Sequence, residues 1–213
     1  MIRCSFLAVG VGMRKQYRHS QDSRRPMIRQ VEYFEKPGKE NTTGCLEIVK
    51  ELVKEGYSHV VVATTGGETG LAFARALKGQ TVNLVAVTHN VGFGPPNQDE
   101  CSEAARKEMQ ALGAKIYTGT ILTRSIDYAF MRQHQGISPS YVAAQTLRLF
   151  CQGMKVAAEI TAEACDAGLV PEGVDVIAVA GAGRGADTVA IIEAHPSHRF
   201  LEIRFRQILA KPI

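Results

Sequence analysis

The sequence contains no tryptophan, no pair of cysteines separated by two residues, and no apolar run near the roughly 20 residues that span a bilayer. Its five cysteines are irregularly spaced, which argues against a disulfide framework and against a zinc site. These absences argue against a membrane partner and against a small secreted domain held together by disulfides. They predict a cytoplasmic protein and no metal site.

Neither sign of charge dominates, since 25 lysines and arginines against 21 acidic residues give a net charge of +4. Much of the excess lies in the first 29 residues, where seven basic residues accompany one acid, Asp22. No aromatic or motif signature of nucleic-acid binding accompanies them, so we expect no nucleic-acid partner. We expect residues 1–26 to be an extension without fixed structure and residues 27–213 to form one α/β domain.

The most informative stretch of the chain is 58–77, SHVVVATTGGETGLAFARAL. Its β-branched apolar run, 60–63, is typical of a strand buried on both faces. A turn rich in glycine and threonine follows, and then a helical pattern. Glycines let a backbone approach an anion closely, and the first N–H groups of a helix favour negative charge. The turn therefore predicts an anion site, although a tight turn without a ligand would use the same glycines.

Patterns elsewhere predict alternating helices and strands. A short edge strand is expected at 31–34, buried strands at 82–88, 114–118 and 174–180, and a strand or short helical turn at 189–193. Alternating polarity at 200–208 predicts a half-exposed antiparallel strand at the sheet edge. Helices are expected at 43–55, 100–112 and 138–167, the last with a bend or break at Gly153.

Such alternation predicts a parallel sheet with helices on both faces. In these sheets ligands bind beyond the carboxyl ends of the strands. Four predicted strand ends are followed by small, polar or basic residues: 64–69, 88–90, 118–120 and 181–188. His89 and Asn90 follow one of them, and Arg184 stands in a glycine-rich loop after another. If the first and fourth of these strands are neighbours, Arg184 and the loop 64–69 face each other across a crevice and could hold a phosphate. A solvated loop position for Arg184 is as consistent with the sequence.

The stretches VVVATTGGETGLAFARAL and NLVAVTHN resemble the C-terminal domain of pyruvate kinase, colinearly over about 41–208. The segments EKPGKENT, TTGGETG and THNVGFG look like a family of prokaryotic proteins that consist of this domain alone. The resemblance implies a three-layer αβα fold with a mainly parallel five-stranded sheet of order 3-2-1-4-5 and an antiparallel last strand.

In pyruvate kinase the corresponding loop binds an allosteric sugar bisphosphate, and the stand-alone family is associated with flavin mononucleotide (FMN). The binding role that the resemblance implies falls on Thr64, Thr65, Gly66, Gly67, Glu68 and Thr69, and more loosely on Gly183, Arg184 and Gly185. Glu68 departs from the pattern because a carboxylate suits a phosphate poorly. Nothing corresponds to the catalytic barrel or to the metal-binding acids of a kinase, so we expect no kinase activity.

Three functions remain open from the sequence. The first is binding of a phosphorylated small molecule, FMN foremost. The second is a small enzyme acting on such a ligand, with His89, Glu68 or Asp187 for acid–base chemistry and Cys45 as a remote option for a nucleophile. The sequence favours a small buried cysteine on a core face at position 45 over that nucleophile. The third is an interaction module or homo-oligomer that uses the apolar tip 91–93 or the strand 200–208. A structural role for His89 in its turn is as consistent with the sequence as a ligand contact.

Overall fold

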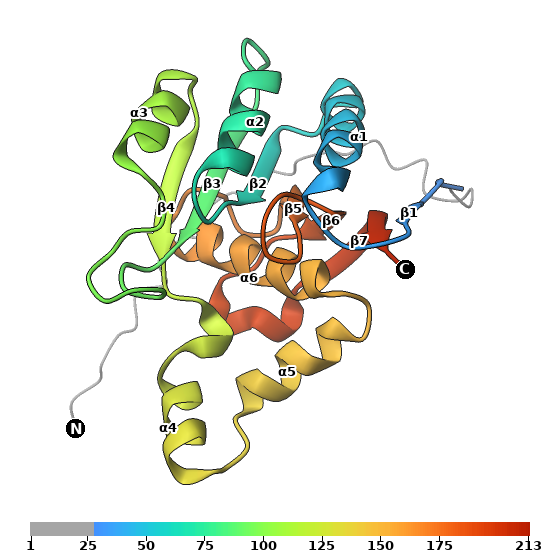
Figure 1. Ribbon diagram of the computed structural model, residues 1–213. Helices are drawn as coiled ribbons and strands as arrows, with labels where there is room; N and C mark the ends of the chain where they lie inside the picture. The colour runs from blue at the N-terminus through green and yellow to red at the C-terminus, as the bar shows by residue number, and fades with distance from the viewer. Residues whose placement is uncertain (1–27) are drawn as a thin grey trace, which may run out of the picture.

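The computed structural model describes residues 28–213, so the extension expected at 1–26 lies outside the described residues. Seven strands form one sheet in the order β1-β7-β6-β5-β2-β3-β4 (Figure 1). Their bounds are β1 Glu32–Phe34, β2 His59–Ala63, β3 Asn83–His89, β4 Lys115–Gly119, β5 Asp175–Ala180, β6 Thr188–Glu193 and β7 Arg204–Pro212. Neighbouring strands pair in parallel except that β6 is antiparallel to both β5 and β7.

Helices cover both faces of this sheet, which gives three layers (Figure 1). The helices are α1 Thr42–Lys54, α2 Glu68–Ala76, α3 Glu103–Ala111, α4 Ile126–His134, α5 Pro139–Arg148 and α6 Gln152–Asp166, with short 3₁₀ turns η1 Lys39–Asn41, η2 Leu122–Arg124 and η3 Ser197–Glu202. Helices α1, α2 and α3 pack with Val60 and Val62 on one face. Helix α6 packs with Val61 and Val85 on the other. Because β2 has helices on both sides, its three valines are fully buried.

The sheet differs from the expected one in two respects. It has more strands, and the strand that runs antiparallel to its neighbours is not the last one. It has seven strands in place of five, because 188–193 and 204–212 both form strands and β1 adds to the edge. The last strand, β7, lies between β6 and β1 and runs with the parallel strands. The strand predicted at 200–208 is present from Arg204 onward and is antiparallel to β6, but its predicted position at the sheet edge is wrong, because β1 pairs with its other side. Residues 197–202 form η3, and the reversed strand is β6.

The helix predicted over 138–167 is two helices. Helix α5 ends at Arg148 and α6 begins at Gln152, with Cys151 in an extended conformation at its N-terminus. The break expected at Gly153 is therefore present a few residues earlier, at 149–151, and Gly153 itself lies in the first turn of α6. A Cβ built there would lie 2.0 Å from Oγ1 of Thr188, so the glycine lets α6 approach β6 closely. Helices α4 and α5 project from the body as an arm (Figure 1).

Among the residues described, no helix has the length and apolar character needed to cross a bilayer.

Candidate functional site

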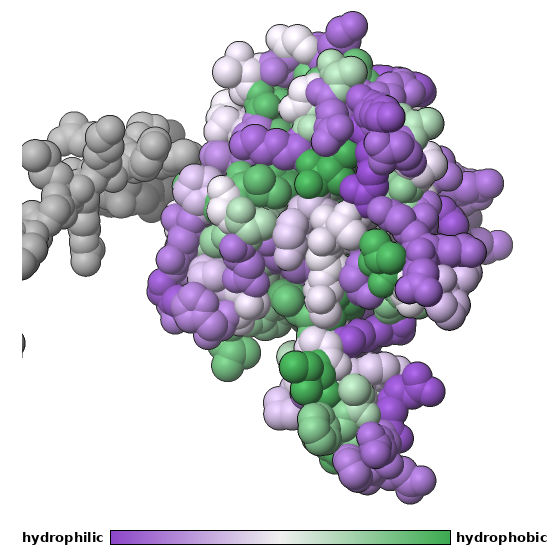
Figure 2. Space-filling model, turned by 90° about the vertical axis from the view of Figure 1, so that its left-hand side faces the viewer, coloured by the Kyte–Doolittle hydropathy of each residue, from purple (hydrophilic) through white to green (hydrophobic). Residues whose placement is uncertain are grey.

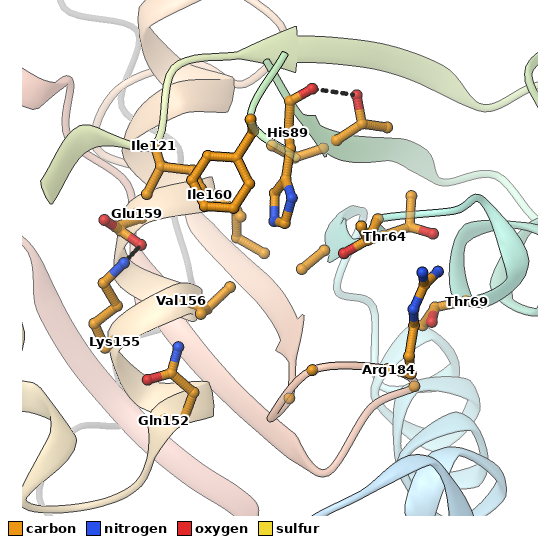
Figure 3. A pocket seen from close by; sticks show the side chains of 18 of the residues that line it. Thr64, Thr69, His89, Ile121, Gln152, Lys155, Val156, Glu159, Ile160 and Arg184 are labelled. Carbon is orange, nitrogen blue, oxygen red and sulfur yellow. Dashed lines mark hydrogen bonds and ion pairs between the residues drawn. The ribbon is translucent and has the colours of Figure 1, made fainter. Parts of the chain in front are cut away.

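A cavity of about 190 Å³ opens at the carboxyl ends of β2, β3 and β5. It is lined by Ala63, Thr64, Thr65, Glu68, Thr69, Val87, Thr88, His89, Phe93, Ile121, Arg124, Arg148, Gln152, Lys155, Val156, Glu159, Ile160, Glu163, Gly181, Gly183, Arg184 and Gly185. Figure 3 shows Thr64, Thr69 and Arg184 on one side of it and the α6 side chains on the other. The cavity therefore has two walls that come from distant parts of the chain.

The first wall is the turn between β2 and α2. Gly67, at φ +104°, takes the left-handed conformation that starts the helix without a side-chain cap. The Thr64 hydroxyl accepts a hydrogen bond from the Gly70 N–H at 3.1 Å, which fixes the turn. Within the described chain, the N–H groups of 65–69 donate to no backbone carbonyl. These free donors and the positive end of α2 make this wall suitable for an anion.

Arg184 faces this turn from the loop between β5 and β6. Its Nη1 lies 3.6 Å from Oε2 of Glu68, and both side chains are largely exposed. A Cβ at Gly66 would lie 2.6 Å from the same guanidinium nitrogen, so the glycine makes room for the arginine. The crevice predicted between Arg184 and the loop 64–69 is present, and its arginine is paired with an exposed carboxylate.

The loop that carries Arg184 is held by Asp187, whose side chain is fully buried. Its Oδ2 accepts hydrogen bonds from the N–H groups of Gly38 and Ala182, both at 3.1 Å. Its Oδ1 accepts one from the Thr188 hydroxyl at 2.7 Å. Because this carboxylate is fully engaged and does not line the cavity, the acid–base role proposed for Asp187 has no support. Its role is to shape the loop.

The second wall is α6, which presents Lys155, Glu159 and Glu163 at four-residue spacing, each at most 4% exposed. Lys155 and Glu159 form an ion pair, drawn in Figure 3. Glu159 also accepts hydrogen bonds from the N–H and hydroxyl of Thr123, at 2.9 and 2.7 Å. Burial lowers the pKa of Lys155, and the adjacent Glu159 carboxylate opposes that effect.

Burial, and secondarily the charge of Glu159, raise the pKa of Glu163 to about 8. The side chain is therefore largely protonated at neutral pH. Two further cations, Arg124 and Arg148, line this half of the cavity. The Arg148 Nε donates to Oε1 of Gln152 at 2.6 Å, which holds the guanidinium beside α6. With Glu163 neutral, the cavity carries four cationic side chains and two carboxylates, a balance that favours an anionic ligand.

His89 lies at the end of β3, and its ring points into the cavity (Figure 3). Its Nδ1 lies 2.9 Å from Oε2 of Glu100, and the Phe93 ring is centred 4.6 Å from its own. The Arg124 guanidinium in turn lies 5.5 Å above the Phe93 ring. The apolar tip 91–93 thus folds partly onto the cavity. His89 is both a structural turn residue, through Glu100, and a cavity residue.

The predicted site residues come together with three exceptions. The members that line the cavity are Thr64, Thr65, Glu68, Thr69, His89, Gly183, Arg184 and Gly185. Gly66, Gly67 and Asn90 do not line it, although the two glycines shape its wall. Cys45 is fully buried and away from the cavity, and burial raises the pKa of its thiol to about 12. The nucleophilic role proposed for Cys45 is therefore wrong.

Sequence reasoning missed the wall formed by α6. The signal was available, because Lys155, Glu159 and Glu163 recur every four residues within a segment otherwise rich in alanine and other small or apolar residues. Charged side chains on the face that packs on a sheet need partners, and such a row indicates a polar cavity or a buried ion pair. No sequence pattern marks Arg148 as a cavity residue, because it faces the cavity only as a result of the break before α6.

Two solved structures match parts of this chain at low similarity. One, a crystal structure of O-ureido-L-serine synthase, is 19% identical with a TM-score of 0.28 and covers 53% of this chain and 29% of that chain. The other is the NH3-dependent NAD synthetase from Campylobacter jejuni subsp. jejuni NCTC 11168 in complex with the nitrate ion, at 18% identity and a TM-score of 0.26. It covers 52% of this chain and 47% of that chain. The chain thus spans less than half the length of either protein.

The comparison with protein families gives a much longer match. The family described as "Pyruvate kinase, alpha/beta domain" matches residues 44–192. That range includes the turn 64–69, the α6 wall and the loop that carries Arg184. By this match over most of its length, the chain belongs to the pyruvate kinase alpha/beta domain family.

Proposed function

We propose that the cavity binds a phosphorylated small molecule, with FMN as the leading candidate. The observation that carries the proposal is the meeting of the free N–H groups of 65–69 with Arg184 at one mouth of the sheet. Backbone donors at a helix N-terminus and a guanidinium fork both suit a phosphate dianion. The phosphate would displace Glu68 from Arg184 and take its place against the turn.

The dimensions of the cavity fit the polar end of such a ligand. Sites that enclose a drug-sized molecule have volumes of roughly 300–1,000 Å³, and this cavity measures about 190 Å³. It has room for a phosphate and part of a polyol chain, and a flavin ring would extend to the mouth, beside Phe93. The proposal includes no kinase activity, because Lys155 is bound to Glu159 and is not free to clamp a transferred phosphoryl group.

The experiment is ligand binding by the purified full chain. We expect flavin absorbance or a phosphate ester in the mass spectrum of whatever co-purifies, and a higher melting temperature with FMN than with riboflavin. Arg184→Ala should weaken FMN binding by roughly 10-fold or more, from the loss of a charge-assisted hydrogen bond. Arg75→Ala is the matched control, because Arg75 is an exposed arginine on α2 that pairs with Glu108 outside the cavity. No ligand and no thermal shift with any phosphate ester would refute the proposal.

One observation favours a small enzyme as a second candidate function. The hydrogen bond that the Nδ1 of His89 donates to Glu100 fixes the ring while the ring faces the cavity, which is the arrangement of an oriented general base. The test is incubation of the protein with phosphate esters, FMN included, followed by product mass spectrometry and assay of released phosphate. His89→Gln should abolish turnover and keep binding. If the wild-type protein yields no product, this second function fails and binding alone remains.

A further inference from the structure

The arm formed by α4 and α5 carries an unusual concentration of exposed apolar side chains. Six of them, exposed by between 38% and 84%, are Ile126, Phe130, Ile137, Tyr141, Val142 and Leu149. We call this set the arm face. Figure 1 shows the arm projecting from the body, and Figure 2 shows apolar side chains gathered on the arm. A monomer rarely exposes a contiguous apolar surface of this kind without a partner.

The shape of the arm face, a ridge between two grooves, is that of a surface that can pack against a copy of itself. Two shallow grooves run along it, one beside α4 and one beside α5, and both are lined by Met131 and Ile137. Ile137, 83% exposed, is therefore a ridge between two grooves. A two-fold contact requires a surface that fits its own copy, and a ridge beside a groove of the same apolar character meets that requirement.

The charges of the grooves also select the partner. Among the described residues that line them, Asp127 is the one fully charged side chain, and it accepts hydrogen bonds from the hydroxyls of Ser138 and Ser140. An anionic lipid surface or a nucleic acid would need lysines or arginines here, and a charged peptide would need opposite charges. A second copy of the same face needs neither.

The area is sufficient for a stable homodimer. Twelve side chains from two arms, each hiding roughly 70 Å², would bury about 800 Å² of apolar surface. Apolar atoms supply about 65% of a homodimer interface, so the whole contact would cover about 1,200 Å². That value is at the lower end of stable, specific interfaces.

We propose that the arm face is the dimer interface of this protein, with the ridge at Ile137 of one copy seated in a groove of the other. This surface differs from the tip 91–93 and from the strand near 200–208. The inference does not depend on the ligand of the cavity.

Sedimentation velocity of the full chain over a concentration series tests the proposal. We expect a monomer–dimer equilibrium in the micromolar range. Ile137→Glu and Leu149→Glu should each weaken it by about 100-fold or more, because each would bury an unpaired carboxylate at the contact. Leu201→Glu is the matched control, since Leu201 is 87% exposed on η3 and is not part of the arm face. Circular dichroism and melting temperature show whether each variant is folded.

The proposal is overturned by a wild-type protein that stays monomeric at about 100 µM, well above the affinity expected of such an interface. It is equally overturned by a dimer that Leu201→Glu disrupts and both arm variants leave intact. A second experiment, co-sedimentation with vesicles that contain anionic lipid, tests whether the arm face binds a membrane. A monomer that co-sediments with the vesicles, and loses that binding on Ile137→Glu, would identify a lipid partner in place of a second copy.

Discussion

At the scale of single residues, Glu68 is the side chain that conflicts with an anion site, and the conflict is testable. Its carboxylate lies against Arg184 and next to the turn that should hold a phosphate. Glu68→Gln removes the competing charge and frees the guanidinium, so we expect FMN or inorganic phosphate to bind about 3- to 10-fold more tightly. Isothermal titration measures the affinity. Weaker binding in this variant would show that Glu68 contacts the ligand directly.

A second prediction at this scale concerns Glu163. Its pKa rises from an ordinary value near 4.5 in the unfolded chain to about 8 in the folded protein. Between these values the folded state binds the extra proton, so its contribution to stability is complete below pH 4.5 and is lost as pH rises through 8. The loss is about 5 kcal/mol at most, since each pKa unit represents about 1.4 kcal/mol.

Urea unfolding of the wild type and of Glu163→Gln between pH 5 and 9 isolates that contribution. The amide stays neutral throughout, so the difference in the free energy of unfolding should grow in favour of the variant as pH rises. Glu103→Gln is the control, because it makes the same change at an exposed acid of α3, outside the cavity. A difference that does not change with pH would show that Glu163 is not held in its neutral form.

At the scale of elements, the close packing of α6 on β6 depends on Gly153. Alanine is the better helix former by about 1 kcal/mol. However, its Cβ would lie 2.5 Å from that of Thr188. We expect Gly153→Ala to destabilise the fold by about 1–3 kcal/mol, the usual cost of overpacking. Gly136→Ala is the control, because a Cβ there meets nothing within 4 Å. Thermal and urea unfolding measure both, and a stabilised Gly153→Ala would contradict the packing.

Some elements of the fold could be predicted from the sequence and others could not. The apolar runs of β2, β3 and β5 were predictable because strands buried on both faces admit few polar residues, and the turn 64–69 was predictable from its glycines. A break near Gly153 was predictable from the length of the expected helix, but the direction of α5 beyond that break was not. It is fixed by how α5 and α6 pack, which is a tertiary effect. The same break places Arg148 in the cavity, so half of the candidate site was hidden with it.

At the scale of the whole molecule, the cavity and the arm face share one element. Arg148, near the end of α5, lines the cavity, and the next residue, Leu149, belongs to the arm face. A dimer contact that holds Leu149 would also fix the backbone that carries Arg148. Ligand binding and self-association should therefore favour each other, and thermodynamic linkage requires the same factor in both directions.

We expect a saturating phosphorylated ligand to strengthen the dimer by about 3- to 10-fold, a coupling of roughly 1 kcal/mol. Sedimentation with and without FMN measures one direction. Titration of FMN into Leu149→Glu, with Leu201→Glu as the control, measures the other. Because linkage already requires equal factors, the size of the common factor measures the coupling between the cavity and the arm face. If the dimer constant stays the same with ligand while Leu149→Glu still breaks the dimer, the two sites are independent, and α5 is rigid enough to hold Arg148 without a partner.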